Sequence, residues 1–93
     1  MQISLPCQVI PKPDVLFQPL NGESILLDLY TEQYYSLDDV GTRMWELFKV
    51  HGNVDTVIQH LLDIYNVEEE DLRRDLAGLI DKLAAAKLIT TEV

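Results

Sequence analysis

The sequence predicts an α+β fold in which a three-stranded antiparallel β-meander is followed by a cluster of three helices. Three observations support this prediction. The pair Asn21-Gly22 separates two apolar runs, a short aromatic segment occupies residues 34–37, and apolar residues recur at helical spacing in three blocks after residue 38. A chain of 93 residues has room for one modest core, so we expect a single domain.

The first thirteen residues differ from the rest of the chain in their proline content. Pro6, Pro11 and Pro13 lie there, which is three of the four prolines in the sequence. Proline fixes φ and has no backbone N–H to donate. We therefore expect residues 1–13 to form an extended N-terminal arm and residues 14–93 to form the folded domain.

The meander is expected between residues 14 and 37. Residues 15–18 and 24–30 are apolar runs on either side of Asn21-Gly22, and both turn residues accept the positive φ of a type I′ hairpin turn. A polar connection at 31–33 leads to the third strand at 34–37. This last strand is an edge of the sheet unless another element covers it.

Each helical block begins at a residue suited to cap a helix. Asp38 and Asn53 are good N-caps, and the third helix starts near Glu68 with an acidic first turn that suits the helix dipole. The expected buried residues are Val40, Met44, Leu47 and Phe48, then Val54, Val57, Ile58, Leu61, Leu62 and Tyr65, then Leu72, Leu76, Leu79, Ile80 and Leu83. Trp45 lies one residue off the first stripe, and we assign it to the core.

The charge balance narrows the classes of partner. Seven Lys and Arg residues against sixteen Asp and Glu residues give a net charge of −9, which repels nucleic-acid phosphates. The N-terminus has no basic segment followed by an apolar core, and no stretch is apolar and long enough to span a membrane. We expect a cytoplasmic protein that binds neither nucleic acid nor membranes. Cys7 is the single cysteine, which excludes an internal disulfide.

No pattern in the sequence indicates catalysis. His51 and His60 lie nine positions apart without metal-ligand spacing, and the four glycines are scattered rather than gathered in a phosphate-binding loop. Ser24 and Ser36 lie in expected strands with no base near them in sequence. We therefore expect no enzyme activity, no cofactor and no metal site.

The expected binding surface is a sheet edge beside a helix. An edge strand can accept an extended peptide as an added strand, and its alternate side chains then enter neighbouring pockets. The strand residues of this candidate site are Gln33, Tyr34, Tyr35, Ser36 and Leu37. On the third helix, the more apolar flank of the core stripe is Arg73, Ala77, Ile80 and Ala84, and the opposite flank is Asp75, Gly78 and Lys82. We assign the first flank to the site.

Residues 25–47 resemble the PqqD-like family. The shared pattern is an apolar strand, a short turn, an aromatic strand ending at Leu37, a polar cap, Val40-Gly41 and a helix that contains Trp45. Val57-Ile58, the break at 65–67 and the helix at 75–79 also fit, so the resemblance covers about residues 14–89. Asp38-Asp39 departs from it, because many relatives have Asn-Pro there.

The resemblance implies a winged-helix-like recognition element for ribosomally made precursor peptides. In such proteins the leader segment of the precursor adds antiparallel to the third strand and lies between that strand and the third helix. The implied partner enzyme is a radical-SAM enzyme, as in pyrroloquinoline quinone synthesis, or the leader peptidase of a lasso-peptide cluster. The sequence does not distinguish these pathways.

Two alternatives stay open at this stage. A winged-helix DNA-binding regulator would have the same elements, but it needs a basic recognition helix and the helix expected at 68–87 is net acidic. A structural subunit or inhibitor could use the same edge on another protein. The proline-rich arm is longer than the resemblance leads us to expect, and it would serve to cover an edge or to form a homodimer by exchange.

Overall fold

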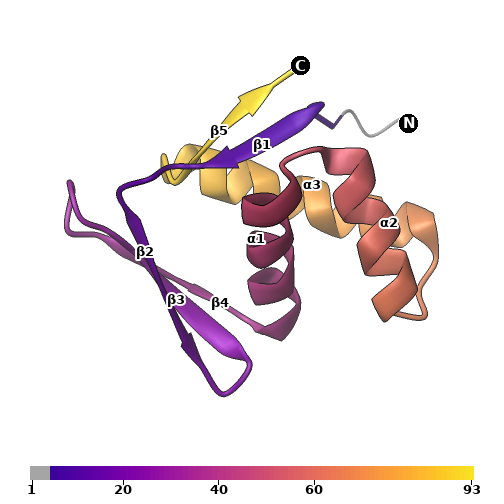
Figure 1. The fold of residues 1–93 in the computed structure, drawn as a ribbon, viewed down its shortest axis with the longest axis horizontal. Helices are drawn as coiled ribbons and strands as arrows, with labels where there is room; N and C mark the ends of the chain where they lie inside the picture. The colour runs from indigo at the N-terminus through magenta and orange to yellow at the C-terminus, as the bar shows by residue number, and fades with distance from the viewer. Residues whose placement is uncertain (1–4) are drawn as a thin grey trace.

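The structure, a computed structural model, describes residues 5–93, so the first four residues of the expected arm lie outside it. Strands and helices follow in the order β1 (Gln8–Pro11), β2 (Val15–Leu20), β3 (Glu23–Asp28), β4 (Tyr34–Leu37), α1 (Asp39–His51), α2 (Val54–Ile64), α3 (Glu69–Ala85) and β5 (Ile89–Glu92). Figure 1 shows the three-stranded sheet β2-β3-β4 on one side of α1 and α2 on the other side. The predicted α+β class is confirmed.

The antiparallel sheet has the order β2-β3-β4, which confirms the meander. Asn21 and Gly22 join β2 to β3 with φ values of 55° and 85°. These positive values are those of a type I′ turn, whose twist suits the flanking strands. The turn makes Leu20 and Glu23 a facing pair, and this fixes the register along the hairpin.

The caps place the helices where the sequence predicts them. Asp38 Oδ1 accepts a hydrogen bond of 2.7 Å from Gly41 N, and Asn53 Oδ1 accepts one of 2.9 Å from Thr56 N. Each bond satisfies an amide that has no partner within its helix. Glu68 is the N-cap of α3 but makes no cap bond through its side chain.

A second ribbon, β1 paired with β5, is a feature that the sequence did not predict. Val9 at its centre is fully buried, and its amide donates to Gly52 O over 2.9 Å. Residues 8–11 of the expected arm are therefore extended, and they pair with the C-terminal segment of the same chain. Both described ends of the chain lie together at this ribbon (Figure 1).

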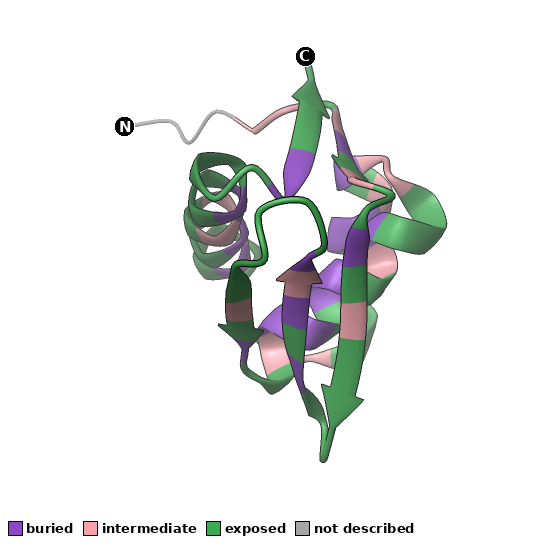
Figure 2. Cartoon of the chain, turned by 90° about the vertical axis from the view of Figure 1, so that its left-hand side faces the viewer, coloured by how far each residue is buried: buried purple, intermediate pink, exposed green. Residues whose placement is uncertain are grey.

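The core lies between the inner face of the sheet and the three helices (Figure 2). Trp45 is fully buried, which confirms its assignment to the core. A buried hydrogen bond of 2.8 Å between the Ser24 and Thr42 hydroxyls ties β3 to α1. The fully buried side chains are Trp45, Phe48, Leu26, Met44, Ile58, Leu61, Leu76, Leu83, Val9, Val54 and Val57.

A membrane span is not found in the described part of the chain, because none of its helices is both long and apolar enough.

Candidate functional site

Strand β4 is an edge of the sheet, and its backbone has an open side. Asp28 N donates to Gln33 O over 2.9 Å, so the backbone groups of Gln33 point toward β3. In an antiparallel ladder such residues alternate with residues whose N–H and C=O point away. Tyr35 and Leu37 therefore face β3 with their backbone, and the N–H and C=O groups of Tyr34 and Ser36 face the open edge.

The side chains of β4 also alternate. Tyr35 and Leu37 stand opposite Leu26 and Ser24 on the inner face, where Leu37 is buried and Tyr35 half-buried. Tyr34 projects from the outer face and is 74% exposed. A strand added at this edge would thus place every second side chain on the same face as Tyr35 and Leu37.

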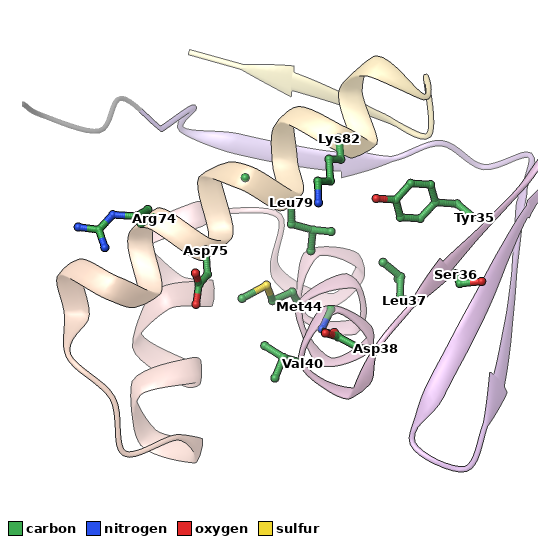
Figure 3. Close-up of a pocket in the computed structure, with 12 residues that line it drawn as sticks. Tyr35, Ser36, Leu37, Asp38, Val40, Met44, Arg74, Asp75, Leu79 and Lys82 are labelled. Carbon is green, nitrogen blue, oxygen red and sulfur yellow. The ribbon is translucent and has the colours of Figure 1, made fainter.

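A cavity of about 700 Å³ lies between β4, the start of α1 and one flank of α3 (Figure 3). This volume falls in the range of about 300 to 1,000 Å³ that is typical of ligand sites. The lining residues are Tyr35, Ser36, Leu37, Asp38, Val40, Gly41, Met44, Arg74, Asp75, Gly78, Leu79 and Lys82. We call this cavity the β4–α3 groove.

The groove has an apolar middle and charged ends. Leu37, Met44 and Leu79 meet in its middle, and Lys82 and Tyr35 project toward one another at one end (Figure 3). Asp75 and Arg74 lie toward the other end, where Arg74 is paired with Glu70 and Asp71. A partly apolar groove with charges at its ends, beside an open strand edge, suits an extended peptide.

Gly78 opens the α3 wall of the groove. A Cβ atom added there would meet no other atom within 4 Å, so this position faces open space. Glycine inside a helix costs about 1 kcal/mol relative to alanine. Gly78 therefore leaves room in the groove that a larger side chain would occupy.

The structure places the predicted strand residues at three kinds of position. Tyr35, Ser36 and Leu37 line the groove. Tyr34, the first residue of β4, does not line it and turns its backbone groups to the open edge. Gln33 precedes the strand, and its carbonyl is used in pairing with β3.

The predicted residues of α3 do not line the groove. Arg73 instead makes ion pairs with Glu69 at 2.9 Å and Asp55 at 3.9 Å, which turns it toward α2. Ile80 is buried in the core. The groove is lined instead by the less apolar flank, which carries Asp75, Gly78 and Lys82.

Ala77 and Ala84 complete the flank that was expected to form the wall, and neither lines the groove. Ile80 belongs to the buried stripe with Leu72, Leu76 and Leu83, so the residues beside it on that flank turn with it away from β4. A glycine inside a helix, Gly78, is the sequence feature that could have indicated the other flank.

Three residues of the groove, Val40, Gly41 and Met44, come from α1. Val40 and Met44 line it, although the sequence assigned both to the core. Met44 is in fact almost fully buried and forms the floor, while Val40 is only partly buried. A single helical stripe thus serves the core and the groove floor together, which periodicity alone does not separate.

The histidines come together, although they are distant in sequence. The rings of His51 and His60 stack with their centroids 4.4 Å apart, because α1 and α2 pack side by side. Residues 5–93 contain no group of three or more His, Cys, Asp or Glu side chains placed to hold a metal ion.

Comparison with known proteins points to one family. The family model described as Coenzyme PQQ synthesis protein D (PqqD) matches residues 23–89. This stretch includes β3, β4, all three helices and the whole β4–α3 groove. A comparison with curated proteins finds no significant match.

Two solved structures are similar to this chain. One is TbiB1 in complex with the TbiA(beta) leader peptide, which is 26% identical with a TM-score of 0.83 over 90% of this chain and 98% of that one. The other is a lasso peptide synthetase B1 complexed with the leader peptide, which is 23% identical with a TM-score of 0.78 over 89% and 98% of the two chains.

Proposed function

Because the chain belongs to the PqqD family, we propose that it binds the leader segment of a ribosomally synthesised precursor peptide and is a recognition element rather than an enzyme. The observation that carries this proposal is the open edge of β4 beside the β4–α3 groove. TbiB1, which shares the fold at 26% identity, was solved with a leader peptide bound.

The edge supplies the affinity that does not depend on the peptide sequence. Tyr34 and Ser36 offer two N–H donors and two C=O acceptors to a strand that adds antiparallel to β4. Extending a sheet in this way satisfies backbone groups of the peptide without reading its side chains.

The groove supplies the selection. Side chains at alternate positions of the added strand would point to the same face as Tyr35 and Leu37, over the apolar middle of the groove. We assign the opposite wall to Asp75, Gly78, Leu79 and Lys82, since these residues line the cavity and Arg73, Ala77, Ile80 and Ala84 do not. The captured leader is then presented to a modifying enzyme or a leader peptidase.

DNA binding, the alternative considered from the sequence, gains no support from the structure or the comparisons. The carboxylates of Glu68, Glu69, Glu70 and Asp71 gather at the start of α3, and both arginines of that helix are paired with acidic side chains. A phosphate backbone would meet repulsion along this helix.

The test is a proline substitution on the edge. Ser36→Pro removes an N–H that points away from β3, so the β3–β4 pairing is retained while the added strand loses a donor and meets the ring. Ser36→Val keeps the N–H and suits a strand. The ligand is the leader segment of a candidate precursor peptide sought among the genes that neighbour this one, and calorimetry measures its affinity for each variant.

We expect Ser36→Pro to weaken leader binding at least about tenfold and Ser36→Val to leave it within about threefold. Only the proline variant loses the N–H donor, and only its ring blocks the approach of the added strand. Circular dichroism and thermal unfolding show whether both variants keep the fold. Equal binding by a folded Ser36→Pro variant and the parent would contradict strand addition at β4.

A further inference from the structure

A second cavity continues the β4–α3 groove beyond the C-terminal end of β4. It measures about 230 Å³ and shares Val40 and Asp75 with the groove. The other lining residues are Tyr65, Val67, Glu68, Asp71 and Leu72. Its volume lies below the range of about 300 Å³ and upward that small-molecule sites occupy, so it suits a single side chain of a longer ligand. We call it the end pocket.

The end pocket combines an apolar lining with unbalanced negative charge. Three carboxylates line it, from Glu68, Asp71 and Asp75, and no cationic side chain does. Asp71 pairs with Arg74 at 3.3 Å, whereas Glu68 and Asp75 form no ion pair within residues 5–93. The dipole of α3 offsets only about half a unit charge at its N-terminus. A cationic group beside this pocket would therefore be attracted.

The opposite end of the groove has the opposite sign. Lys82 projects there toward Tyr35 (Figure 3), and it forms no ion pair in the described part of the chain. Tyr35 of β4 lies at the Lys82 end, and the chain then runs through Leu37, the end of β4, to Val40 of α1 at the end pocket. The negative end pocket and the positive Lys82 are therefore at opposite ends of the path that an added strand would follow along β4.

On the basis of the proposed function, we propose that the groove selects leader peptides by the order of basic and acidic residues along their sequence. The end pocket takes an apolar side chain with a Lys or Arg beside it, and Lys82 pairs with an Asp or Glu at the other end. Because a strand antiparallel to β4 runs from the end pocket toward Tyr35, the basic residue is N-terminal to the pairing segment and the acidic residue C-terminal.

Charge order also sets the direction of the peptide. A strand bound parallel to β4 could form backbone hydrogen bonds too, but a leader with its basic residue at the N-terminal side would then place that residue at Lys82. Repulsion there and the loss of attraction at Glu68 and Asp75 both disfavour the parallel arrangement. These charges are exposed, so salt screens their interactions with the peptide and weakens the preference for the antiparallel arrangement. The Debye length is about 8 Å at physiological ionic strength.

The experiment uses a displayed library of random 12-residue peptides as the probe. Peptides that bind the parent chain are kept when they fail to bind Ser36→Pro, which selects for the β4 edge. The same selection is run on the double variant Glu68→Lys/Asp75→Lys. The matched control is Asp63→Lys/Asp81→Lys, which changes the net charge equally at positions outside both cavities.

We expect peptides selected on the parent to carry Lys or Arg on the N-terminal side and Asp or Glu on the C-terminal side. The Glu68→Lys/Asp75→Lys variant should lose the basic preference, and peptides selected on the parent should bind it about threefold to tenfold more weakly at low salt. The control variant should keep the parent preference.

The outcomes separate this inference from the proposed function. Edge-dependent peptides without a charge order, or an equal change in the control variant, would overturn the inference and leave strand addition intact. If no peptide distinguishes the parent from a folded Ser36→Pro variant, both proposals fail.

Discussion

Strands β2 and β4 are the two edges of one sheet, yet their exposed backbones differ. Asp14 O accepts from Leu29 N, so by alternation Val15, Phe17 and Pro19 turn their backbone outward on β2. Val15 N already donates to Lys12 O over 3.3 Å, and Pro19 has no N–H to offer. Phe17 is left as the one outward position of β2 with a free donor in the described chain.

On β4 both outward residues, Tyr34 and Ser36, keep their donors, and the groove lies alongside. Natural sheets commonly protect edges with proline or with local backbone bonds. One edge of this sheet is protected in that way and the other is open next to a cavity. The difference supports the proposal that a peptide adds to β4 rather than to β2.

The largest effect that would sharpen this comparison is expected at Gly78. Gly78→Gln places a helix-compatible side chain in open space inside the groove, so leader affinity should fall about tenfold or more while the helix is strengthened. Ala84→Gln is the control, because Ala84 is exposed on α3 but does not line the groove. Calorimetry measures the affinity of each variant for the leader peptide. If Ala84→Gln lowered this affinity and Gly78→Gln left it unchanged, the peptide would be using the other flank of α3.

The next effect concerns the junction that holds β4 against α1. Asp38→Ala removes the cap bond of 2.7 Å to Gly41 N, so the free energy of unfolding should fall by about 1 kcal/mol. Asp39→Ala, a neighbouring exposed carboxylate whose side chain bonds only the next amide, is the matched control. Urea unfolding followed by circular dichroism measures both, and equal stability of the two variants would contradict the role of the cap.

Local signals explain why most of the fold could be predicted from the sequence. The turn at Asn21-Gly22 and the caps at Asp38 and Asn53 depend on residues close to one another in the chain, and the structure confirms all of them. The β1–β5 ribbon depends instead on pairing between Ile10 and Thr90, 80 positions apart. Each strand has only four residues, so neither carries a pattern strong enough to indicate its partner.

The strand side of the candidate site could also be predicted from the sequence, whereas its helix side could not. The edge strand follows from the order of the elements, and Tyr35 to Leu37 do line the groove. Which flank of α3 faces β4 depends on how the helix is rotated by core packing. The more apolar flank, with Ala77 and Ala84, was expected to do so, but the cavity is lined by the other flank. Asp75 and Lys82 line the groove although both are charged, because a groove wall stays in contact with water.

The smallest effect is expected at the protected edge. Pro19→Val restores an outward N–H on β2, far from the β4–α3 groove, so leader affinity should stay within about twofold. Sedimentation at high protein concentration should show increased self-association, because Leu16 and Leu20 are exposed on that strand. A marked loss of leader binding by a folded Pro19→Val variant would break the comparison, since it would place the peptide on β2.

The most direct test of strand addition at β4 is amide hydrogen exchange measured residue by residue with and without the leader peptide. Exchange at Tyr34 and Ser36 should slow by about tenfold or more on binding, because their outward amides gain partners. Phe17, the free outward amide of β2, should exchange at the same rate in both states. Protection of Phe17 with no change at Tyr34 and Ser36 would contradict the account.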